Sequence, residues 1–507
     1  MPTPEECHVL SKLLNYQIPH FYQMVETMKE NNCILDASDT GTGKTYSAIA
    51  LCTYLKKKPF IICPKSVIPT WITVANYFKI PLFAICNYEL LKGGKYYTEN
   101  LEKVPCPYMD KVEKMVFNPK NGKMEKKITF EFQLPPNDVV VVFDEAHRCK
   151  NYGSMTSQLF QSVVKTKCKI LLLSATISDK INCFKPFGLA FGFYAQLRDY
   201  NMWMKRQIKM RKLQFMKRQI ADLDDKRLTV IHENVFPQKG SRMKILELGD
   251  LFPKNNVISQ SYFCSNYKEV QKEYDIINDS LEDLQKQEDA TEALGKIIKA
   301  RQRIEMYKVP IFIDLAEEAL DNGYSVAIFL NYLDTLDVLC HHLKCDCTIQ
   351  GGQTIEERQM CIDDFQSNKA KVIISIIQAG GIGVSLHDVL GGHPRMSLIS
   401  PTWSGQDIKQ ALGRIHRAKS QSPAIQKIVY CARTYEDKLS EIIDVKIKNI
   451  DAINDHDLLG NKFSIVDLKE IPLNSLTTGA HVQELKKSKK KFEIYDLMGG
   501  GRSKKAK

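Results

Sequence analysis

The residues best suited to chemistry lie in one glycine-rich segment, Thr40-Gly41-Thr42-Gly43-Lys44-Thr45, which follows a short apolar run and opens a helical pattern. Glycine permits the tight turn that aims backbone N–H groups at phosphate oxygens, and a helix beginning there adds its positive amino end. The pattern predicts a phosphate-binding loop, with Lys44 at the β- and γ-phosphates and Thr45 as a Mg²⁺ ligand. Ser38 stands where the strict pattern has glycine.

A pair of acids, Asp144 and Glu145, follows the strand-like run Val139 to Phe143. Ligands of parallel α/β sheets bind at the carboxyl ends of the strands, so this pair would face the phosphate loop. We predict that Asp144 holds Mg²⁺, directly or through water, and that Glu145 orients and deprotonates an attacking water. The alternative, that both acids only cap a helix, leaves the upstream phosphate loop unexplained.

Two arginines, Arg414 and Arg417, are three residues apart, which places them on one face of a predicted helix. A phosphoryl group in transfer needs a cation that stays protonated, and arginine meets that need better than lysine. The commoner alternative is a solvated basic helix face. The predicted catalytic residues are therefore Lys44, Asp144, Glu145, Arg414 and Arg417.

The elements that must position these residues form two regions in which strand-like runs alternate with helical patterns, as in parallel α/β sheets. We predict an α/β protein of two tandem parallel-sheet domains, at 1–235 and 311–460, joined by a helical connector at 236–310. The first domain carries a hairpin insertion at about 101–138, with the turn Asn121-Gly122, and a basic helical segment at about 201–221. An extension at 461–507 ends in a basic tail that cannot bury enough apolar surface to order itself.

Composition narrows the class of protein further. The 507 residues carry a formal net charge of +12, and 44% are hydrophobic, which excludes a disordered or collagen-like chain. No run reaches the ~18 apolar residues needed to cross a bilayer, and the first residues lack a signal peptide's pattern, so we expect neither a membrane nor a secreted protein. Fifteen cysteines scattered through apolar segments indicate buried thiols in a reducing, intracellular compartment.

Further motifs surround the predicted site in a fixed order: 16–20 (YQIPH), 63–71 (CPKSVIPTW), 87–89 (NYE), 144–151 (DEAHRCKN), 173–176 (LSAT), 378–386 (QAGGIGVSL) and 410–417 (QALGRIHR). Together they resemble the motifs of the superfamily 2 helicases and translocases, especially the Swi/Snf-like branch, over residues 16 to about 441. The sequence of residues 34–45 also resembles that of helicase-like ATPases of large DNA viruses and phages, among them the poxviral transcript-release type.

The resemblance implies two RecA-like lobes with ATP and Mg²⁺ in the cleft between them. It implies Gln17 as an adenine contact and the residues Thr40 to Thr45 at the phosphates. Residues that couple hydrolysis to movement would be His147, Ser174, Thr176 and Gln410.

Nucleic-acid contacts are predicted less directly. The segment from Lys205 to Arg218 interleaves basic and apolar residues without an acid, which suits backbone phosphates but equally suits the outer face of a packed helix. The candidates are Lys65, Lys205, Arg206, Arg211, Lys212 and Gly381. A group of Cys and His residues at 340–347 has no standard zinc spacing, so we predict no metal ligand there.

These expectations describe a nucleic-acid-dependent ATPase, either a DNA helicase or a translocase on duplex DNA. Duplex DNA is the favoured partner, with RNA and the transcription machinery as further candidates. A viral role in transcription or genome maintenance would place it in the cytoplasm or nucleus of an infected cell, or in the virion. Two alternatives stay open: an RNA helicase, because such proteins grip the backbone more than the bases, and an ATP-gated clamp that does not step.

Overall fold

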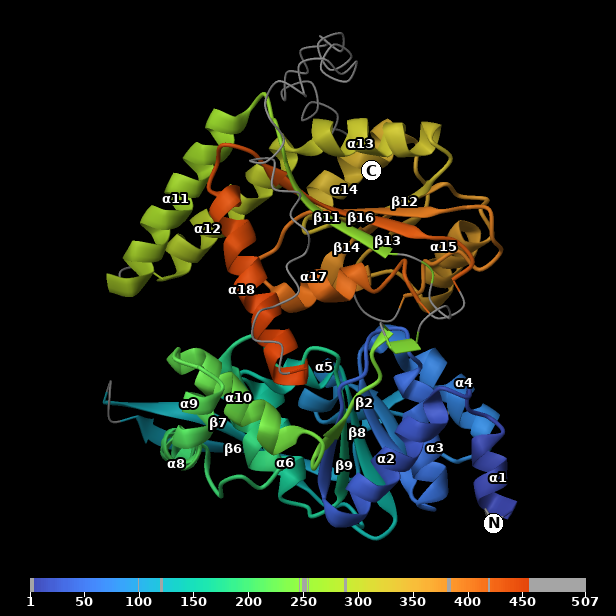
Figure 1. Ribbon diagram of the computed structural model, residues 1–507, viewed down its shortest axis with the longest axis vertical. Coiled ribbons are helices and arrows are strands. Elements are labelled where there is room, and N and C mark those ends of the chain that lie inside the picture. The colour runs from blue at the N-terminus through green and yellow to red at the C-terminus, as the bar shows by residue number, and fades with distance from the viewer. Residues whose placement is uncertain are drawn as a thin grey trace, which may run out of the picture.

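The computed structural model describes residues 4–98, 100–118, 122–245, 247–248, 253, 255–286, 290–380, 384–417 and 420–455. Within these ranges the chain forms two α/β lobes, one above the other in Figure 1. Gly381 and the predicted extension at 461–507, with its basic tail, lie outside the described residues.

The first lobe is built on an eight-stranded sheet of order β10-β1-β9-β8-β2-β3-β4-β5, parallel from β10 to β3 and antiparallel beyond it. Its strands are β1 (Cys33–Asp36), β2 (Lys58–Cys63), β3 (Ala84–Asn87), β4 (Lys95–Tyr97), β5 (Lys103–Pro105), β8 (Val139–Asp144), β9 (Lys169–Leu173) and β10 (Gly240–Ser241). Its helices are α1 (Pro4–Leu10), α2 (Gln17–Glu30), α3 (Lys44–Tyr54), α4 (Ile68–Phe78), α5 (Tyr88–Lys92), α6 (Met155–Val164), α7 (Lys185–Ala190), α8 (Tyr200–Met210), α9 (Lys212–Lys217) and α10 (Leu223–Val235).

Both faces of this sheet are buried, which explains why its strands read as continuous apolar runs. Successive side chains of a strand point to opposite faces, so Val140 and Val142 of β8 pack with α2, α3 and α4. Val141 and Phe143 of the same strand pack with α6, α7 and α10 on the other face. The carboxyl ends of β1, β8 and β9 therefore meet at one edge, where the predicted motifs follow them.

The second lobe is built on a six-stranded sheet of order β11-β16-β15-β12-β14-β13, with parallel pairing throughout. Its strands are β11 (Asn255–Tyr262), β12 (Ser325–Leu330), β13 (Thr348–Ile349), β14 (Val372–Ile376), β15 (Arg395–Ile399) and β16 (Ala424–Cys431). Its helices are α11 (Tyr267–Lys286), α12 (Ala290–Tyr307), α13 (Val309–Asp321), α14 (Leu333–Leu343), α15 (Ile355–Gln366), α16 (Ile377–Gly380), α17 (Gly405–Leu412) and α18 (Glu436–Asp455). The predicted α/β fold with two tandem parallel-sheet domains is confirmed.

The segment 236–310, predicted as a helical connector, differs from that expectation. It contributes β10 to the first sheet and β11 to the second, and its long helices are α11 and α12. The β-branched pair Val257 and Ile258 lies in β11, which pairs with β16 over eight residues. Local periodicity missed β11 because a single strand of mixed polarity carries a weak pattern, and its pairing partner is more than 160 residues away.

Two excursions leave the first lobe. Strands β6 (Met109–Asn118) and β7 (Lys123–Phe132) pair in register as an antiparallel hairpin, which projects from the lobe in Figure 1. The basic segment folds as α8 and α9, whose inner side buries Met204 and Phe215 against the lobe core.

Helix α18 runs from the second lobe back to the first and ends there, as Figure 1 shows. Its last turn buries Ala452 and Ile453 completely in the core of the first lobe. The two lobes are thus joined by the connecting chain and by this returning helix.

Candidate functional site

The glycine-rich loop between β1 and α3 has the geometry of a phosphate-binding loop. Gly41 and Gly43 have φ of 89° and 90°, a left-handed conformation that glycine adopts without strain. Helix α3 begins at Lys44, whose Nζ donates to the carbonyl oxygens of Ser38 at 2.7 Å and Asp39 at 3.0 Å. These carbonyls hold the ammonium group over the loop, where phosphate oxygens could replace them as acceptors.

Gln17 holds the phosphate-binding loop through hydrogen bonds of its side-chain amide. Its Nε2 donates to the Thr42 carbonyl at 2.9 Å, and its Oε1 accepts from the Leu14 amide at 2.9 Å. A Cβ at Gly43 would lie 2.2 Å from Gln17 Nε2 and would displace that amide, and the φ of 90° at Gly43 also disfavours any residue with a side chain. The structure therefore places Gln17 against the phosphate loop with its amide engaged, and its predicted adenine contact stays a prediction.

Asp144 and Glu145 lie at the carboxyl end of β8. Asp144 accepts from Trp71 Nε1 at 2.9 Å and from the Glu145 amide at 3.0 Å. Glu145 has φ of 54°, an uncommon left-handed conformation of the kind that clusters at functional sites. Burial and the charge of Glu145 raise the pKa of Asp144 to about 6, and the nearby charge of Lys44 offsets these effects only in part.

Four predicted coupling residues lie around Glu145. Its Oε2 is 3.3 Å from His147 Nδ1 and accepts from Gln410 Nε2 at 3.0 Å. His147 Nδ1 is also 3.2 Å from Ser174 Oγ, which accepts from the Thr176 amide at 3.2 Å. Gln410 belongs to α17 of the second lobe, so one hydrogen bond joins Glu145 to the opposite lobe.

The two predicted arginines are placed differently from the sequence expectation. Helix α17 ends at Leu412, and Arg414 and Arg417 lie in the turn that follows rather than on a helix face. Gly413 is the first residue after the helix. Arg414 Nε donates to the Gln410 carbonyl at 3.0 Å, and Arg417 donates to Ser385 Oγ at 2.7 Å and to the Val384 carbonyl at 2.8 Å.

The turn after α17 touches the phosphate loop directly. A Cβ at Gly41 would lie 2.9 Å from Arg417 Cγ, and a Cβ at Gly413 would lie 2.0 Å from Thr40 Oγ1. Burial, together with the charge of Arg414, lowers the pKa of Arg417 to about 9, and burial also lowers the pKa of Lys44. Cations held in this way favour a bound anion, and the acids opposite favour a bound cation, which together suit a metal-bound polyphosphate.

The contact at Gly413 gives a test of lobe closure. Gly413 has φ of −81°, so alanine adds no backbone strain there, but its methyl group would collide with Thr40. We expect Gly413→Ala to reduce the ATPase rate at saturating ATP by at least about tenfold, since close approach of catalytic groups supplies much of the rate. ADP affinity, measured by fluorescence titration, should change by less than about twofold. Gly153→Ala, at a glycine with open space around it, is the control.

A second cleft lies between the lobes, away from the phosphate loop. It has a volume of about 480 Å³ and is lined from the first lobe by Lys65, Asn87 and Arg148 and from the second by Gly351, Thr354 and Arg358. Lys65 is one of the predicted nucleic-acid candidates, whereas Arg148 and Arg358 are not among them. Arg148 stands within the DEAHRCKN motif and could have been noticed, whereas nothing in the sequence marks Arg358.

The predicted basic segment divides into two sets. Lys205, Arg206 and Lys212 are exposed, whereas Arg211 pairs with Glu233 at 2.9 Å and is partly buried. Arg211 therefore has a structural partner within the lobe. In the described part of the chain no group of three or more potential ligands could hold a metal ion, the cysteines and histidines at 340–347 included.

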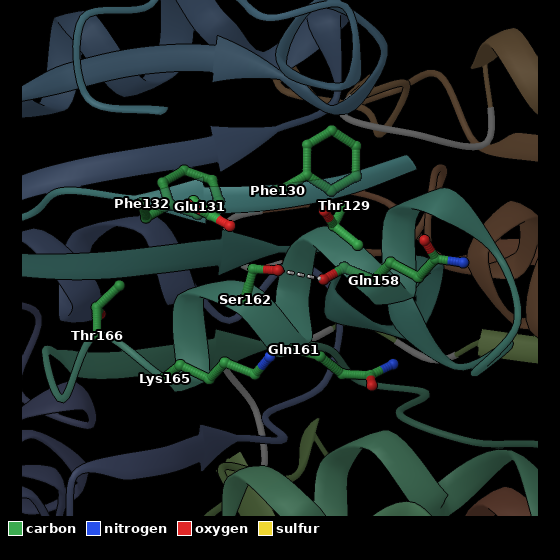
Figure 2. A pocket seen from close by; sticks show the side chains of 9 residues that line it. All are labelled: Thr129, Phe130, Glu131, Phe132, Gln158, Gln161, Ser162, Lys165 and Thr166. Atoms are coloured by element: carbon green, nitrogen blue, oxygen red, sulfur yellow. Dashed lines mark hydrogen bonds between the residues drawn. The ribbon is translucent and has the colours of Figure 1, made fainter. Parts of the chain in front are cut away.

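A further groove lies between β7 of the hairpin and α6 (Figure 2). Its volume is about 620 Å³, and Figure 2 shows polar side chains such as Gln158 and Ser162 beside Thr129 and Phe132. None of the predicted site residues lines it.

Two family models match parts of this chain. Residues 10–179 match the family model described as "Type III restriction enzyme, res subunit", and residues 308–419 match "Helicase conserved C-terminal domain". A protein of Acanthamoeba polyphaga mimivirus, named as a putative ATP-dependent RNA helicase, is 36% identical over 90% of this chain and 86% of its own. The ISWI chromatin-remodeling complex ATPase of Saccharomyces cerevisiae is 22% identical over 87% of this chain and 40% of its own.

Among solved structures, the SWI2/SNF2 ATPase core of Sulfolobus solfataricus in complex with dsDNA is similar, with a TM-score of 0.34 and 17% identity over 88% of this chain and 94% of that one. The family models and the curated relatives show that the chain belongs to the superfamily 2 helicases, in their Swi/Snf-like branch and of the viral type. The protein is an ATP-hydrolysing enzyme. Within the described ranges, no helix is long and apolar enough to cross a membrane.

Proposed function

We propose that the protein uses ATP hydrolysis to move along duplex DNA whose backbone lies in the cleft between the lobes. The observation that carries this proposal is the cleft itself, because Lys65 and Arg148 reach it from one lobe and Arg358 from the other. A backbone held by both lobes is displaced when the lobes move relative to each other. Closure at the phosphate loop would then be coupled to a step along the strand.

In this proposal each residue of the site acts on ATP or on water. Lys44 leaves the carbonyls of Ser38 and Asp39 and binds the β- and γ-phosphates. Glu145 accepts a proton from the attacking water, while His147 and Gln410 hold its carboxylate in place. Arg414 and Arg417 offset the charge that develops on the γ-phosphate.

Mg²⁺ suits the same site. The carboxyl of Asp144 has a raised pKa because it is buried beside a second acid, and a divalent cation would relieve that repulsion. Asp144 and Thr45 are the proposed ligands, and the ion would neutralise charge on the phosphates when bound.

The choice of duplex DNA rests on the resemblance of the motifs to the Swi/Snf-like branch and on relatives named as chromatin-remodeling complex ATPases. The name of the mimiviral relative supports RNA as the second candidate. The viral source of that relative supports action within an infected cell, where a role in transcription or genome maintenance is part of the proposal. Lys205, Arg206 and Lys212 remain proposed as further backbone contacts.

The salt dependence of DNA affinity tests whether the DNA backbone lies in the cleft between the lobes. Each phosphate contact released shifts the slope of log affinity against log salt by about 0.9. We expect Lys65→Ala and Arg358→Ala each to weaken duplex DNA binding and to flatten that slope by about one. Lys268→Ala removes an exposed lysine of α11, outside the cleft lining, and should leave the slope unchanged. If Lys205→Ala flattened the slope and Lys65→Ala did not, the DNA path would run over α8 instead.

A further inference from the structure

The chain that leaves the first lobe runs alongside the phosphate loop. Strand β10 pairs with β1. Just beyond β10, the Met243 carbonyl accepts a hydrogen bond from the Asp39 amide at 3.0 Å. The Ile245 amide then donates to Asp39 Oδ2 at 2.9 Å. The outer side of the loop is therefore held by the first residues of the segment that connects the lobes.

Arg242 lies between this segment and the loop, with its side chain only 8% exposed. Its Nη1 donates to the Ala37 carbonyl at 2.7 Å, and its Nη2 lies 3.0 Å from Asp39 Oδ1. The same guanidinium meets both carboxylate oxygens of Asp455, with Nε 2.7 Å from Oδ1 and Nη2 2.9 Å from Oδ2. One side chain thus joins the phosphate loop to the last turn of α18.

That last turn is anchored in the first lobe by other contacts. The Ile453 carbonyl lies 3.0 Å from His232 Nδ1 of α10, and Asn454 Nδ2 donates to the Ala175 carbonyl at 2.8 Å. Ala175 is the neighbour of the coupling residues Ser174 and Thr176. Helix α18 originates in the second lobe, so Arg242 is a point where the position of that helix can act on the nucleotide loop.

We propose that Arg242 is a positioning residue of the ATPase, which holds the phosphate loop in its binding conformation and makes that conformation depend on the docking of Asp455. The loop contains two glycines in left-handed conformation, so its own backbone restrains it weakly. A planar guanidinium can bind two partners in fixed directions, which an ammonium group cannot do. The inference concerns nucleotide binding alone and is independent of which nucleic acid the protein uses.

Lys244 supplies a matched comparison. Its Nζ also lies near Asp455, at 3.3 Å from Oδ1, and it pairs with Glu247 at 3.3 Å. The ion pairs of Lys244 are with these two residues, not with the phosphate loop. A change at Lys244 therefore alters the α18 pairing without altering the hold on the loop.

The test is a double-mutant cycle on ADP affinity, measured with a fluorescent ADP analogue on the full chain without nucleic acid. We expect Arg242→Gln to weaken ADP binding about tenfold and Asp455→Asn about threefold, since charge-assisted hydrogen bonds are lost in both. The double variant should resemble Arg242→Gln, because Asp455 acts only through Arg242. Arg242→Lys should fall between wild type and Arg242→Gln, and Lys244→Gln should stay within about twofold of wild type.

A purely structural role would give a different result. It would lower the melting temperature and the active fraction, so kcat would fall while the KM for ATP and the ADP affinity stayed constant. The proposal is overturned by that result, by effects of the two substitutions that simply multiply, or by an equal effect of Lys244→Gln. If Arg242→Gln does not fold, Asp455→Asn against Lys244→Gln still decides, because only the former should weaken ADP binding.

Discussion

Replacing Glu145 by glutamine is expected to slow ATP hydrolysis by about 10² to 10⁴, the range that a positioned general base contributes. Glutamine has the same shape and keeps an oxygen that can accept the hydrogen bond from Gln410 Nε2. Binding should therefore survive while deprotonation of water fails. Single-turnover hydrolysis, measured beside equilibrium ATP binding, separates the two effects.

Lys44→Ala is the contrasting variant. The Nζ of Lys44 lies over the phosphate loop, and its removal should abolish hydrolysis by removing phosphate binding. Loss of ATP affinity in Lys44→Ala with retained affinity in Glu145→Gln supports the two assignments. A Glu145→Gln variant that turned over at the wild-type rate would show that another group activates the water.

The second large effect is expected at Arg417, since a finger arginine can contribute about 10³ to 10⁵ in rate. Arg417 belongs to the second lobe, yet its Cγ lies against Gly41 of the phosphate loop. Its guanidinium is held by Ser385 and Val384 within its own lobe and must turn to reach a γ-phosphate. We expect Arg417→Ala to keep ATP and DNA affinity within a small factor but to lose DNA-stimulated hydrolysis.

Two companion variants sharpen this test. Arg417→Lys keeps most of the aliphatic stem that contacts Gly41, so it should retain the packing while losing the planar fork. Arg303→Ala removes an arginine of α12 that pairs with Glu273, and should leave the rate unchanged. Full stimulation by DNA in Arg417→Ala would exclude this residue as the finger.

The phosphate loop and the acid pair could be predicted because the local sequence pattern determines their structure. The phosphate loop and the two acids each follow a strand, and both strands end at the same edge of the sheet. The order of strands and motifs along the chain was therefore sufficient to predict that Lys44 and Glu145 share one site. The approach of Gln410 to Glu145 required the lobes to close, and only the resemblance to a known family anticipated it. Ser38, which departs from the glycine pattern, accepts from the Met243 amide at 2.9 Å, a contact that no local rule predicts.

Residues defined by long-range partners were missed. Strand β11 pairs with β16, and Arg242 meets Asp455 across more than 200 residues of chain. Arg211 looked like the other basic residues of its segment, but Glu233 of α10 pairs with it. These pairings depend on which surfaces the tertiary fold brings together. The helical or strand periodicity of a segment holds no information about its long-range partners.

Movement along duplex DNA driven by lobe closure can be tested by measuring ATP turnover of the full chain with duplex DNA, single-stranded DNA and RNA in parallel, at saturating ATP and fixed salt. If a backbone spanning both lobes favours closure, duplex DNA should raise turnover by at least about tenfold, within what a finger arginine can supply, and more than the other two. Gly413→Ala should remove that increase. Stimulation by RNA alone would contradict the choice of DNA, and turnover that no nucleic acid changes would contradict the coupling of closure to hydrolysis.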